Sequence, residues 1–318
     1  MIYPIISCSL VFVIIGGVQA ALPAYSRRTI FFSVTVPEQF RETAEARSIL
    51  RRFRRLILLW TIAAEVLSVA TIYTGIPWLL PAALLVLGAG TVGAYARARK
   101  QTRQFSVAPS AERTASLAAQ SDGLRGSYFI LAAAAAPFIA AALFARSRWN
   151  QIPDTVALST AFAVSGSVDI VLLLLALAIL HGSRRGSPMR SVNLTVLIAF
   201  MLMNSVAPAA FTALQWIEPS EQFWGQTFSF GELLFLAGMV VWGLRRGSQL
   251  RDSWDTTPDE CWKLGQFYYN PQDPALLVEH RFGLGYSPNF ARPLSWIAMT
   301  ALFLLPALVV VSMIIANM

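Results

Sequence analysis

Residues 51–78 have the sequence RRFRRLILLWTIAAEVLSVATIYTGIPW, and this stretch decides the class of fold. A cluster of arginines precedes the apolar run Leu56–Tyr73. The run is long enough to cross about 30 Å of hydrocarbon as a helix. Residues Thr74–Pro77 then end the helix, because Gly and Pro are poor helix formers. A second apolar run begins at Trp78. The pattern therefore predicts a hairpin of two transmembrane helices, with the arginines at one face of the membrane.

The composition of the whole chain agrees with this class. Hydrophobic residues make up 56% of the chain and charged residues 13%, compared with about 25% charged residues in soluble domains. Unpaired backbone groups are costly in lipid, so each long apolar run should be a helix. We predict an all-α polytopic membrane protein with eight transmembrane helices. The predicted spans are Ile2–Pro23, Leu56–Tyr73, Trp78–Tyr95, Tyr128–Phe144, Val156–Leu180, Val192–Ile217, Phe228–Leu244 and Trp296–Ala316.

The basic residues predict the orientation of these helices. All of the 25 Lys and Arg residues except Arg146 and Arg148 fall in alternate gaps between the apolar runs. Cytoplasmic loops retain Lys and Arg, so we expect a multi-pass protein of the cell (inner) membrane with both termini outside. The expected partner of this charge is the anionic inner leaflet rather than nucleic acid, because the basic residues flank apolar runs. The predicted cytoplasmic segments are 25–55, 96–127, 181–191 and 245–295.

The domain organisation follows from these gaps. Residues 1–244 would hold helices one to seven, residues 245–295 a small cytoplasmic domain, and residues 296–318 the eighth helix. An alternative stays open at the N-terminus, where Val18-Gln19-Ala20 resembles a signal-peptidase site. Cleavage there would leave seven spans with the same loop orientation.

The first cytoplasmic loop is expected to contain a helix. Pro37 and Glu38 predict its start, and the acids that follow precede the arginines, an order that complements the helix dipole. We expect a helix of about five turns that continues into the second span. Two interpretations stay open: the helix anchors the chain on the lipid headgroups, or it docks a partner.

Residues 262–293 combine aromatic and turn-forming residues between the seventh and eighth predicted spans. Residues 267–269 and 276–278 have strand character, and two Asx-Pro pairs between them favour turns. Gly283 and Gly285 allow a second sharp bend. We therefore predict a small folded cytoplasmic domain, and we expect it to pack on the first cytoplasmic loop.

This segment resembles the domain of unknown function numbered 5808, which is found at the end of predicted bacterial and archaeal membrane proteins. The stretch Phe31–Pro37 resembles the same proteins. They often carry a companion membrane domain numbered 1648, which also occurs in bacteriocin-immunity and signalling proteins. The resemblance therefore implies a diverged domain of this kind in the N-terminal part of the chain. The resemblance implies a multispan membrane protein and supplies no catalytic residue. The residues that carry it in the C-terminal segment are Gly265, Tyr268, Asn270, Asp273, Pro274, Val278, Arg281, Gly283, Gly285, Asn289, Phe290, Arg292 and Pro293.

Three acidic residues, Glu65, Asp169 and Glu232, fall within the predicted spans, and Asn204 adds a polar group to the sixth span. An acid at mid-membrane costs about 2.5–3.5 kcal/mol on insertion scales, which makes these residues functional candidates. No Lys or Arg lies at matching depth. Two interpretations stay open. The acids form a proton- or cation-coupled pathway, or they make polar contacts between helices that are worth less than about 2 kcal/mol each.

The sequence contains no Walker loop, dinucleotide fingerprint or Ser-His-Asp arrangement. Its two cysteines and two histidines form no cluster, so we expect no metal site and no cofactor. In the C-terminal segment, the residues Asp273, Glu279, Arg281 and Arg292 are either an acid–base set or salt bridges and turn caps.

We therefore predict a regulatory, sensor or immunity-like membrane protein, not an enzyme, that binds a protein partner at its cytoplasmic face. The alternative is a proton- or cation-coupled secondary transporter that uses the intramembrane acids. An intramembrane or lipid-modifying enzyme is a third hypothesis, and it rests on acidic pairs alone. The sequence does not distinguish a monomer from a homo-oligomer.

Overall fold

The computed structural model describes residues 2–26, 28–76, 78–107, 124–151, 155–182, 188–217, 221–249, 257–281 and 284–300. The chain divides into two compact units. The first unit consists of Met1–Leu117, Val240–Asp273 and Val278–Asn289. The second unit consists of Ala118–Met239, Pro274–Leu277 and Phe290–Met318.

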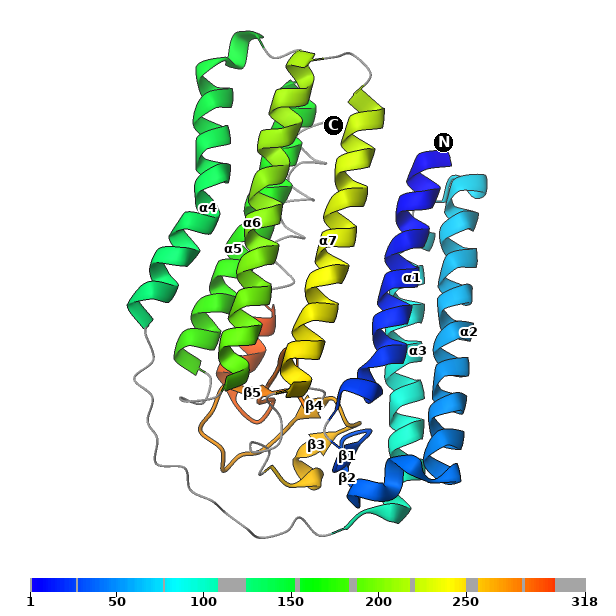
Figure 1. Cartoon of the computed structure of the whole chain (residues 1–318). Coiled ribbons are helices and arrows are strands. Elements are labelled where there is room, and N and C mark those ends of the chain that lie inside the picture. The colour runs from blue at the N-terminus through cyan, green and yellow to red at the C-terminus, as the bar shows by residue number, and fades with distance from the viewer. Residues whose placement is uncertain are drawn as a thin grey trace. The chain divides into compact units, whose positions relative to one another are not determined.

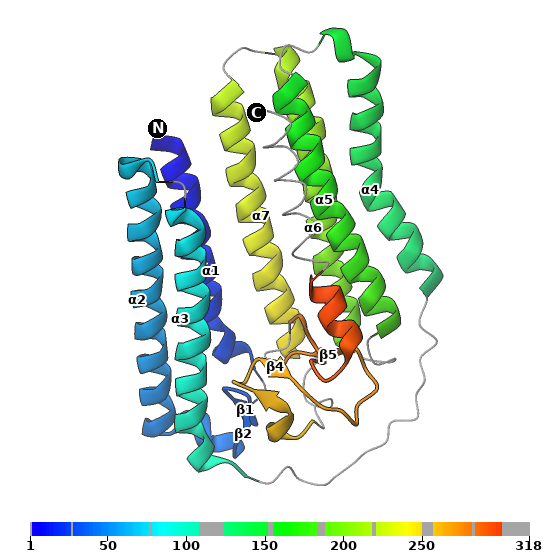
Figure 2. The same ribbon diagram turned by 180° about the vertical axis from the view of Figure 1, so that it is seen from behind.

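Three long helices form the frame of the first unit: α1 (Ile2–Tyr25), α2 (Ala44–Thr74) and α3 (Leu79–Thr102). Helix α2 packs on both α1 and α3, and the three helices lie side by side in Figures 1 and 2. Gly75 ends α2 in the left-handed conformation, with a φ of 69°, and its N–H donates to the carbonyl of Thr71 at 3.0 Å. This confirms the predicted break between the second and third apolar runs.

Helix α2 begins later than the sequence predicted. Residues Glu38–Glu42 form a short 3-10 helix, η1, and Thr43 then adopts an extended conformation. The hydroxyl of Thr43 accepts a hydrogen bond from the N–H of Ala46 at 3.2 Å. The predicted start at Pro37 is wrong as the start of an α-helix, because a Thr hydroxyl caps the first turn and Pro has no such acceptor. The predicted continuation into the second span is confirmed, since α2 runs unbroken to its end.

A tight hairpin that the sequence did not predict precedes η1. Strand β1 (Ile30–Phe31) pairs antiparallel with β2 (Val34–Thr35). The two turn residues, Phe32 and Ser33, have φ values of 47° and 57°, which cost about 1–2 kcal/mol for each non-Gly residue. Burial offsets this cost, because the Phe32 ring is 1% exposed and meets the ring of Phe53 edge-on at 4.9 Å. The hairpin is thereby fixed in the aromatic core between α2 and α3.

The later part of the first unit contains most of the predicted small domain, whereas residues 274–277 and 290–295 belong to the second unit. Strand β3 pairs antiparallel with β4, and β5 pairs with β6. The strands confirm the strand character of residues 267–269 and 276–278, so the fold is mostly rather than purely helical. Gly285, with a φ of 82°, confirms a bend at that position, whereas Gly283 lies outside the described residues. The elements are η4 (Asp259–Cys261), β3 (Trp262–Lys263), β4 (Phe267–Tyr268), β5 (Leu277–Glu279) and β6 (Tyr286–Pro288).

The described part of the second unit is mostly helical, apart from short stretches such as residues 274–277 and 290–292. Helix α6 packs on both α4 and α5. Residues 293–300 are also helical, and Pro293 stands at the start of this helix, where its missing N–H leaves no helical hydrogen bond unmade. The rest of the predicted eighth span lies outside the described residues. The elements are α4 (Leu124–Ser147), η3 (Trp149–Gln151), α5 (Thr155–Gly182), α6 (Pro188–Ile217) and the first part of α7 (Glu221–Gln249). The end of α7 belongs to the first unit, as does η2 (Arg103–Phe105).

Four helices in the described part of the chain are long and apolar enough to cross a membrane. A shorter apolar helical stretch covers Leu10–Tyr25. These findings support a membrane-spanning protein. They do not confirm eight spans: the predicted spans in α2 and α7 are helical, but neither is among the four. The four candidate spans are Leu79–Phe105, Tyr128–Ser147, Ala161–His181 and Met189–Ala210.

Candidate functional site

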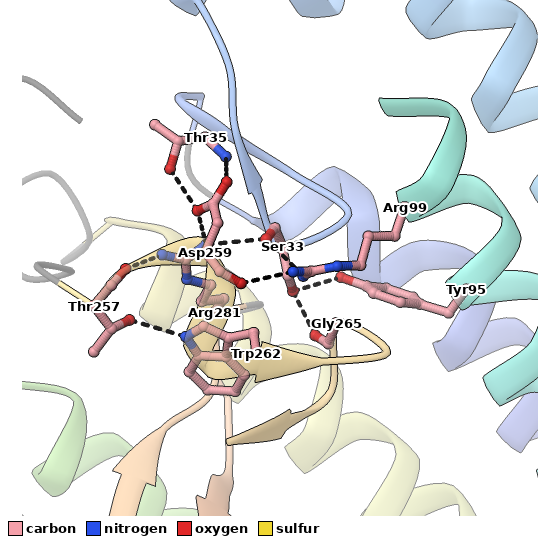
Figure 3. A network of polar contacts seen from close by, with 9 residues as sticks. All are labelled: Ser33, Thr35, Tyr95, Arg99, Thr257, Asp259, Trp262, Gly265 and Arg281. Atoms are coloured by element: carbon pink, nitrogen blue, oxygen red, sulfur yellow. Dashed lines mark hydrogen bonds and ion pairs between the residues drawn. The ribbon is translucent and has the colours of Figure 1, made fainter. Parts of the chain in front are cut away.

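The candidate site is a polar network in the first unit, where the β1–β2 hairpin, α3, residues 257–265 and Arg281 meet (Figure 3). It confirms the predicted packing of the first loop, residues 27–55, on the C-terminal segment. The side chains and backbone groups come from positions that are far apart in the sequence. The nine residues of this network are Ser33, Thr35, Tyr95, Arg99, Thr257, Asp259, Trp262, Gly265 and Arg281.

Arg281 is a buried member of this network that contacts residues from both the hairpin and the later segment. Its side chain is 2% exposed, and its Nη1 lies 2.6 Å from Oδ1 of Asp259. The same nitrogen donates to the carbonyl of Ser33 at 3.0 Å, and Nη2 donates to the carbonyl of Thr257. The guanidinium also lies over the ring of Trp262, 5.8 Å from its centroid. Arg281 therefore joins the β1–β2 hairpin to the segment that begins at Thr257.

Arg99 reaches the same groups from α3. It is 5% exposed. Its Nη1 donates to the carbonyl of Ser33 at 2.9 Å, and its Nη2 donates to the carbonyl of Asp259 at 2.7 Å. The carbonyl of Ser33 thus accepts hydrogen bonds from two arginines and fills both of its lone pairs. These backbone acceptors satisfy the buried positive charge that the single carboxylate of Asp259 leaves unbalanced.

The carboxylate of Asp259 is held by donors on both oxygens. The N–H of Thr35 donates to Oδ2 at 2.9 Å, and the hydroxyl of Thr35 donates to Oδ1 at 2.8 Å. Burial alone raises the pKa of Asp259, but the hydrogen bond and the charge of Arg281, with the two Thr35 donors, outweigh it and hold the pKa below its usual range. Asp259 is therefore ionised at neutral pH and pairs with Arg281 as a charge.

The Ser33 hydroxyl connects α3 to the turn between β3 and β4. It donates to the carbonyl of Gly265 at 2.6 Å and lies 3.0 Å from the hydroxyl of Tyr95. Gly265 has a φ of 82°, and a Cβ added there would lie 2.6 Å from Cε1 of Tyr95. Gly265, one of the predicted motif residues, therefore lets the turn lie directly against α3.

A second network in the first unit holds four more of the predicted motif residues, Tyr268, Asn270, Asp273 and Asn289. Asn289 is fully buried. Its Nδ2 donates to the carbonyls of Asn270 and Asp273 at 2.9 and 3.0 Å, and its Oδ1 accepts from the N–H of Asn270 at 3.0 Å. The hydroxyl of Tyr268 donates to Oδ2 of Asp273 at 2.9 Å and accepts from Nδ2 of Asn270 at 3.1 Å. In this geometry the side chains fix the 270–273 turn.

Other motif residues lie apart from these two networks. Pro274 is exposed and Arg292 is half-buried, and both belong to the second unit. The sequence predicts that a set of four residues forms either an acid–base group or salt bridges and turn caps. One of them, Arg281, pairs with Asp259, which was not among the four. Glu279 of that set is half-buried in β5.

Asp169 and Asn204, two predicted intramembrane candidates, are in contact within the second unit. Asp169 on α5 is 7% exposed. Its Oδ1 accepts from Nδ2 of Asn204 at 2.8 Å, and its Oδ2 accepts from the hydroxyl of Ser205 at 2.7 Å, both on α6. Asn204 also exchanges hydrogen bonds with Ser165 on α5, at 2.8 and 2.9 Å. The cluster therefore ties α5 to α6 through polar contacts in an apolar setting.

The other two acids are not part of this cluster. Glu65 lies half-buried on α2 in the first unit, and its Oε1 has no hydrogen-bond partner within the described residues. Glu232 lies half-buried on α7 in the second unit. The predicted acids are thus divided between the two units.

Sequence reasoning missed Arg99 and Asp259 as members of the site. Arg99 stands in the basic stretch Arg97–Lys100, where every basic residue fits the pattern of a charge at the membrane surface. The helical phase was the signal that could have separated it, because Arg99 follows Tyr95 by four residues and shares its buried face. Asp259 lies three residues before the segment 262–293, whose aromatic and turn-forming residues predicted a folded domain.

The comparisons with known proteins bear on the C-terminal part of the chain. Residues 271–296 match a family of unknown function, DUF5808. No curated protein and no solved structure matches the chain. The DUF5808 match confirms the predicted resemblance for these residues, and it includes Arg281 and Asn289. The resemblance of the N-terminal part to the companion domain numbered 1648 stays a prediction.

The small domain of the first unit is expected to lose stability in acid. The ring of His280 packs 5.4 Å from that of Trp262, and its Nδ1 is buried. Burial lowers the pKa of His280 from 6.5 to about 3. Between these values the unfolded chain binds a proton that the folded chain does not, so stability falls as the pH falls through this window. Asp259 has the same effect at lower pH. Because its pKa is lowered in the folded chain, the stability that its carboxylate contributes is lost as the pH falls below 3.8, the ordinary pKa of an aspartate.

We expect the free energy of local unfolding to fall by about 1–2 kcal/mol between pH 7 and pH 5, which allows for the partial exposure of the His280 residue. Hydrogen exchange at the N–H of Tyr269, which donates to the carbonyl of Cys261 at 2.8 Å, measures this change after correction for intrinsic rates. His280→Gln should remove most of the dependence. If the free energy of local unfolding depends on pH as strongly in His280→Gln as in the unmodified protein, the dependence does not come from His280.

Proposed function

We propose that the chain is a regulatory membrane protein of the sensor or immunity-like kind, and that its DUF5808-bearing domain binds a protein partner at the cytoplasmic face. The single observation that carries this proposal is the buried contact of Arg281 with Asp259 and Ser33. This contact fixes the domain to the hairpin that packs on α2 and α3. A domain held in one position on membrane helices is suited to recognition, because binding then orders few additional residues.

The β3–β4 hairpin offers a surface for such a partner. Leu264, Phe267 and Tyr269 are 54%, 37% and 45% exposed, although apolar side chains of this size are usually buried. Leu264 also has a φ of 51°. A strained, exposed leucine beside exposed aromatic side chains is more typical of a binding surface than of a packing defect.

Site-specific photo-crosslinking tests this surface in the full-length protein in its native membrane. A benzophenone amino acid at Tyr269 should give a discrete adduct with another protein. The matched control places the same group at Tyr73, which is 82% exposed and lies near the other end of α2. An adduct of equal yield at both positions, or none at Tyr269, would contradict the proposal.

Membrane topology is part of the same proposal. We propose eight spans, a location in the cell membrane, and termini outside. A reporter protein fused after Met318 should be active beyond the membrane and silent in the cytosol, because the polar segments 25–55 and 245–295 carry the retained positive charge. Activity in the cytosol would contradict the proposed position of the C-terminus.

A proton- or cation-coupled transporter is the second candidate, and the buried contact of Asp169 with Asn204 and Ser205 favours it. A carboxylate in an apolar helix pair is a candidate carrier. Under this hypothesis Asp169→Asn abolishes coupled uptake or proton flux in proteoliposomes, whereas Ser167→Ala leaves it intact. Equal flux in Asp169→Asn and the unmodified protein would leave only the interpretation of polar contacts between helices.

A further inference from the structure

A cavity of about 170 Å³ lies between the first half of α2 and the last turns of α3 in the first unit. Its apolar floor includes Phe53, Leu56 and Ala94. Sites that enclose a whole small molecule usually measure about 300–1,000 Å³. This cavity is smaller, so it suits the head of a larger ligand whose remainder lies along the helices.

The rim of this cavity is basic. Arg52, Arg55 and Arg97 line it, and all three are exposed. Arg52 and Arg55 are three residues apart on α2 and so share a helix face. Within the described residues none of the three has a hydrogen bond or an ion pair, and none of the residues that line the cavity is acidic.

This arrangement favours an anion with several oxygen atoms. Like charges on one helix face repel each other, and an anion bound among them relieves the repulsion. Guanidinium groups bind phosphate with two parallel hydrogen bonds, which makes arginine the usual residue for phosphate recognition. Gln101, which also lines the cavity, adds a neutral donor on α3.

The position of the arginines along the helices identifies the source of the phosphate. Arg55 directly precedes the predicted span that begins at Leu56, and Arg97 follows the predicted end at Tyr95 by two residues. Helix α3 is one of the four candidate spans. Lipid phosphates lie at the ends of transmembrane helices, and basic pockets between such helices bind anionic headgroups.

We infer that the cavity binds the phosphate headgroup of an anionic phospholipid, and that an acyl chain of the lipid lies along the apolar floor. An adjoining cavity of about 390 Å³ shares Arg52 and Gln101 but also includes Glu45. The carboxylate of Glu45 disfavours an anion there, so the phosphate sits at the end lined by Arg55 and Arg97. This site is independent of the partner surface on the β3–β4 hairpin.

Lipid titration of the purified full-length protein in neutral detergent tests the inference. The probe is phosphatidylglycerol, and the readouts are bound lipid by native mass spectrometry and the thermal unfolding midpoint. Arg52→Gln/Arg97→Gln should weaken binding by about tenfold or more. The matched control, Arg51→Gln/Lys100→Gln, removes the same charge from the same two helices outside the cavity lining, and binding should stay within about threefold.

Phosphatidylcholine and inorganic phosphate are the comparison ligands. Phosphatidylcholine should not raise the unfolding midpoint, and inorganic phosphate at the same concentration should not displace phosphatidylglycerol. Equal weakening in both double variants, or displacement by inorganic phosphate, would overturn the inference. If Arg52→Gln/Arg97→Gln does not fold, Arg55→Gln alone enters the same titration, and undiminished binding there would also overturn it.

Discussion

Replacing Arg281 by methionine is expected to destabilise the contact between the β1–β2 hairpin and the small domain by about 3–5 kcal/mol. Methionine fills the space of the arginine stem but has no charge and no donor. The carboxylate of Asp259, which is only 22% exposed, then loses an ion pair of 2.6 Å. The carbonyls of Ser33 and Thr257 each lose a donor as well. The uncompensated carboxylate is the largest of these costs.

Hydrogen exchange at the N–H of Thr35 reports this contact, because that group donates to Oδ2 of Asp259 at 2.9 Å. Exchange there should accelerate by about a hundredfold or more. In Arg281→Lys, the exchange rate at Thr35 should lie between those of the unmodified protein and Arg281→Met. The ammonium keeps the charge but cannot make the two parallel hydrogen bonds of the guanidinium. Arg281→Met/Asp259→Asn should recover part of the loss, because no unpaired carboxylate remains.

Lys263→Met is the matched control, since Lys263 is exposed in the same domain. It should change the free energy of unfolding by less than about 0.5 kcal/mol. Unchanged protection of Thr35 in Arg281→Met would contradict the assignment, because the hairpin and the domain would then be held together by other contacts.

Local chemistry made part of the fold predictable. Gly75 ends α2 because only a residue that tolerates positive φ continues the chain at that point without strain. The strands around the 270–273 turn follow from Asx-Pro turn formers between β-branched and aromatic residues. The packing of the first loop on residues 262–293 was expected because both segments were predicted to lie on the same side of the membrane, and the Ser33–Gly265 contact confirms this packing.

The pattern of basic residues gave a wrong prediction where an arginine is buried. Lys and Arg near apolar runs usually extend to the headgroups, and the prediction treated Arg99 in this way. Its true surroundings depend on the carbonyls of Ser33 and Asp259, which are distant in sequence. The same limit applies to the turn at Phe32 and Ser33. Its positive φ values oppose local preference and persist because the tertiary core buries Phe32.

Replacing Trp262 by alanine is the second change with a large expected effect, about 3–5 kcal/mol in the stability of the small domain. The Trp262 side chain is 1% exposed, and its ring lies 5.2 Å from that of Tyr268 and 5.4 Å from that of His280. Its Nε1 donates to the hydroxyl of Thr257 at 2.9 Å. Alanine leaves a cavity under Arg281 and removes the aromatic face on which its guanidinium lies.

The loss is expected to spread from the domain to the hairpin, because Trp262 supports the arginine that joins them. Exchange at the N–H of Tyr268, which donates to the hydroxyl of Ser287 at 2.9 Å, should accelerate together with exchange at Thr35. Trp262→Phe keeps an aromatic ring but lacks the Nε1–H donor, and should lower the stability of the small domain by about 1–3 kcal/mol. Tyr269→Ala, at a position 45% exposed, serves as the control. Faster exchange at Tyr268 with an unchanged Thr35 would mean that Arg281 holds its position without the indole, and that the two parts of the site unfold separately.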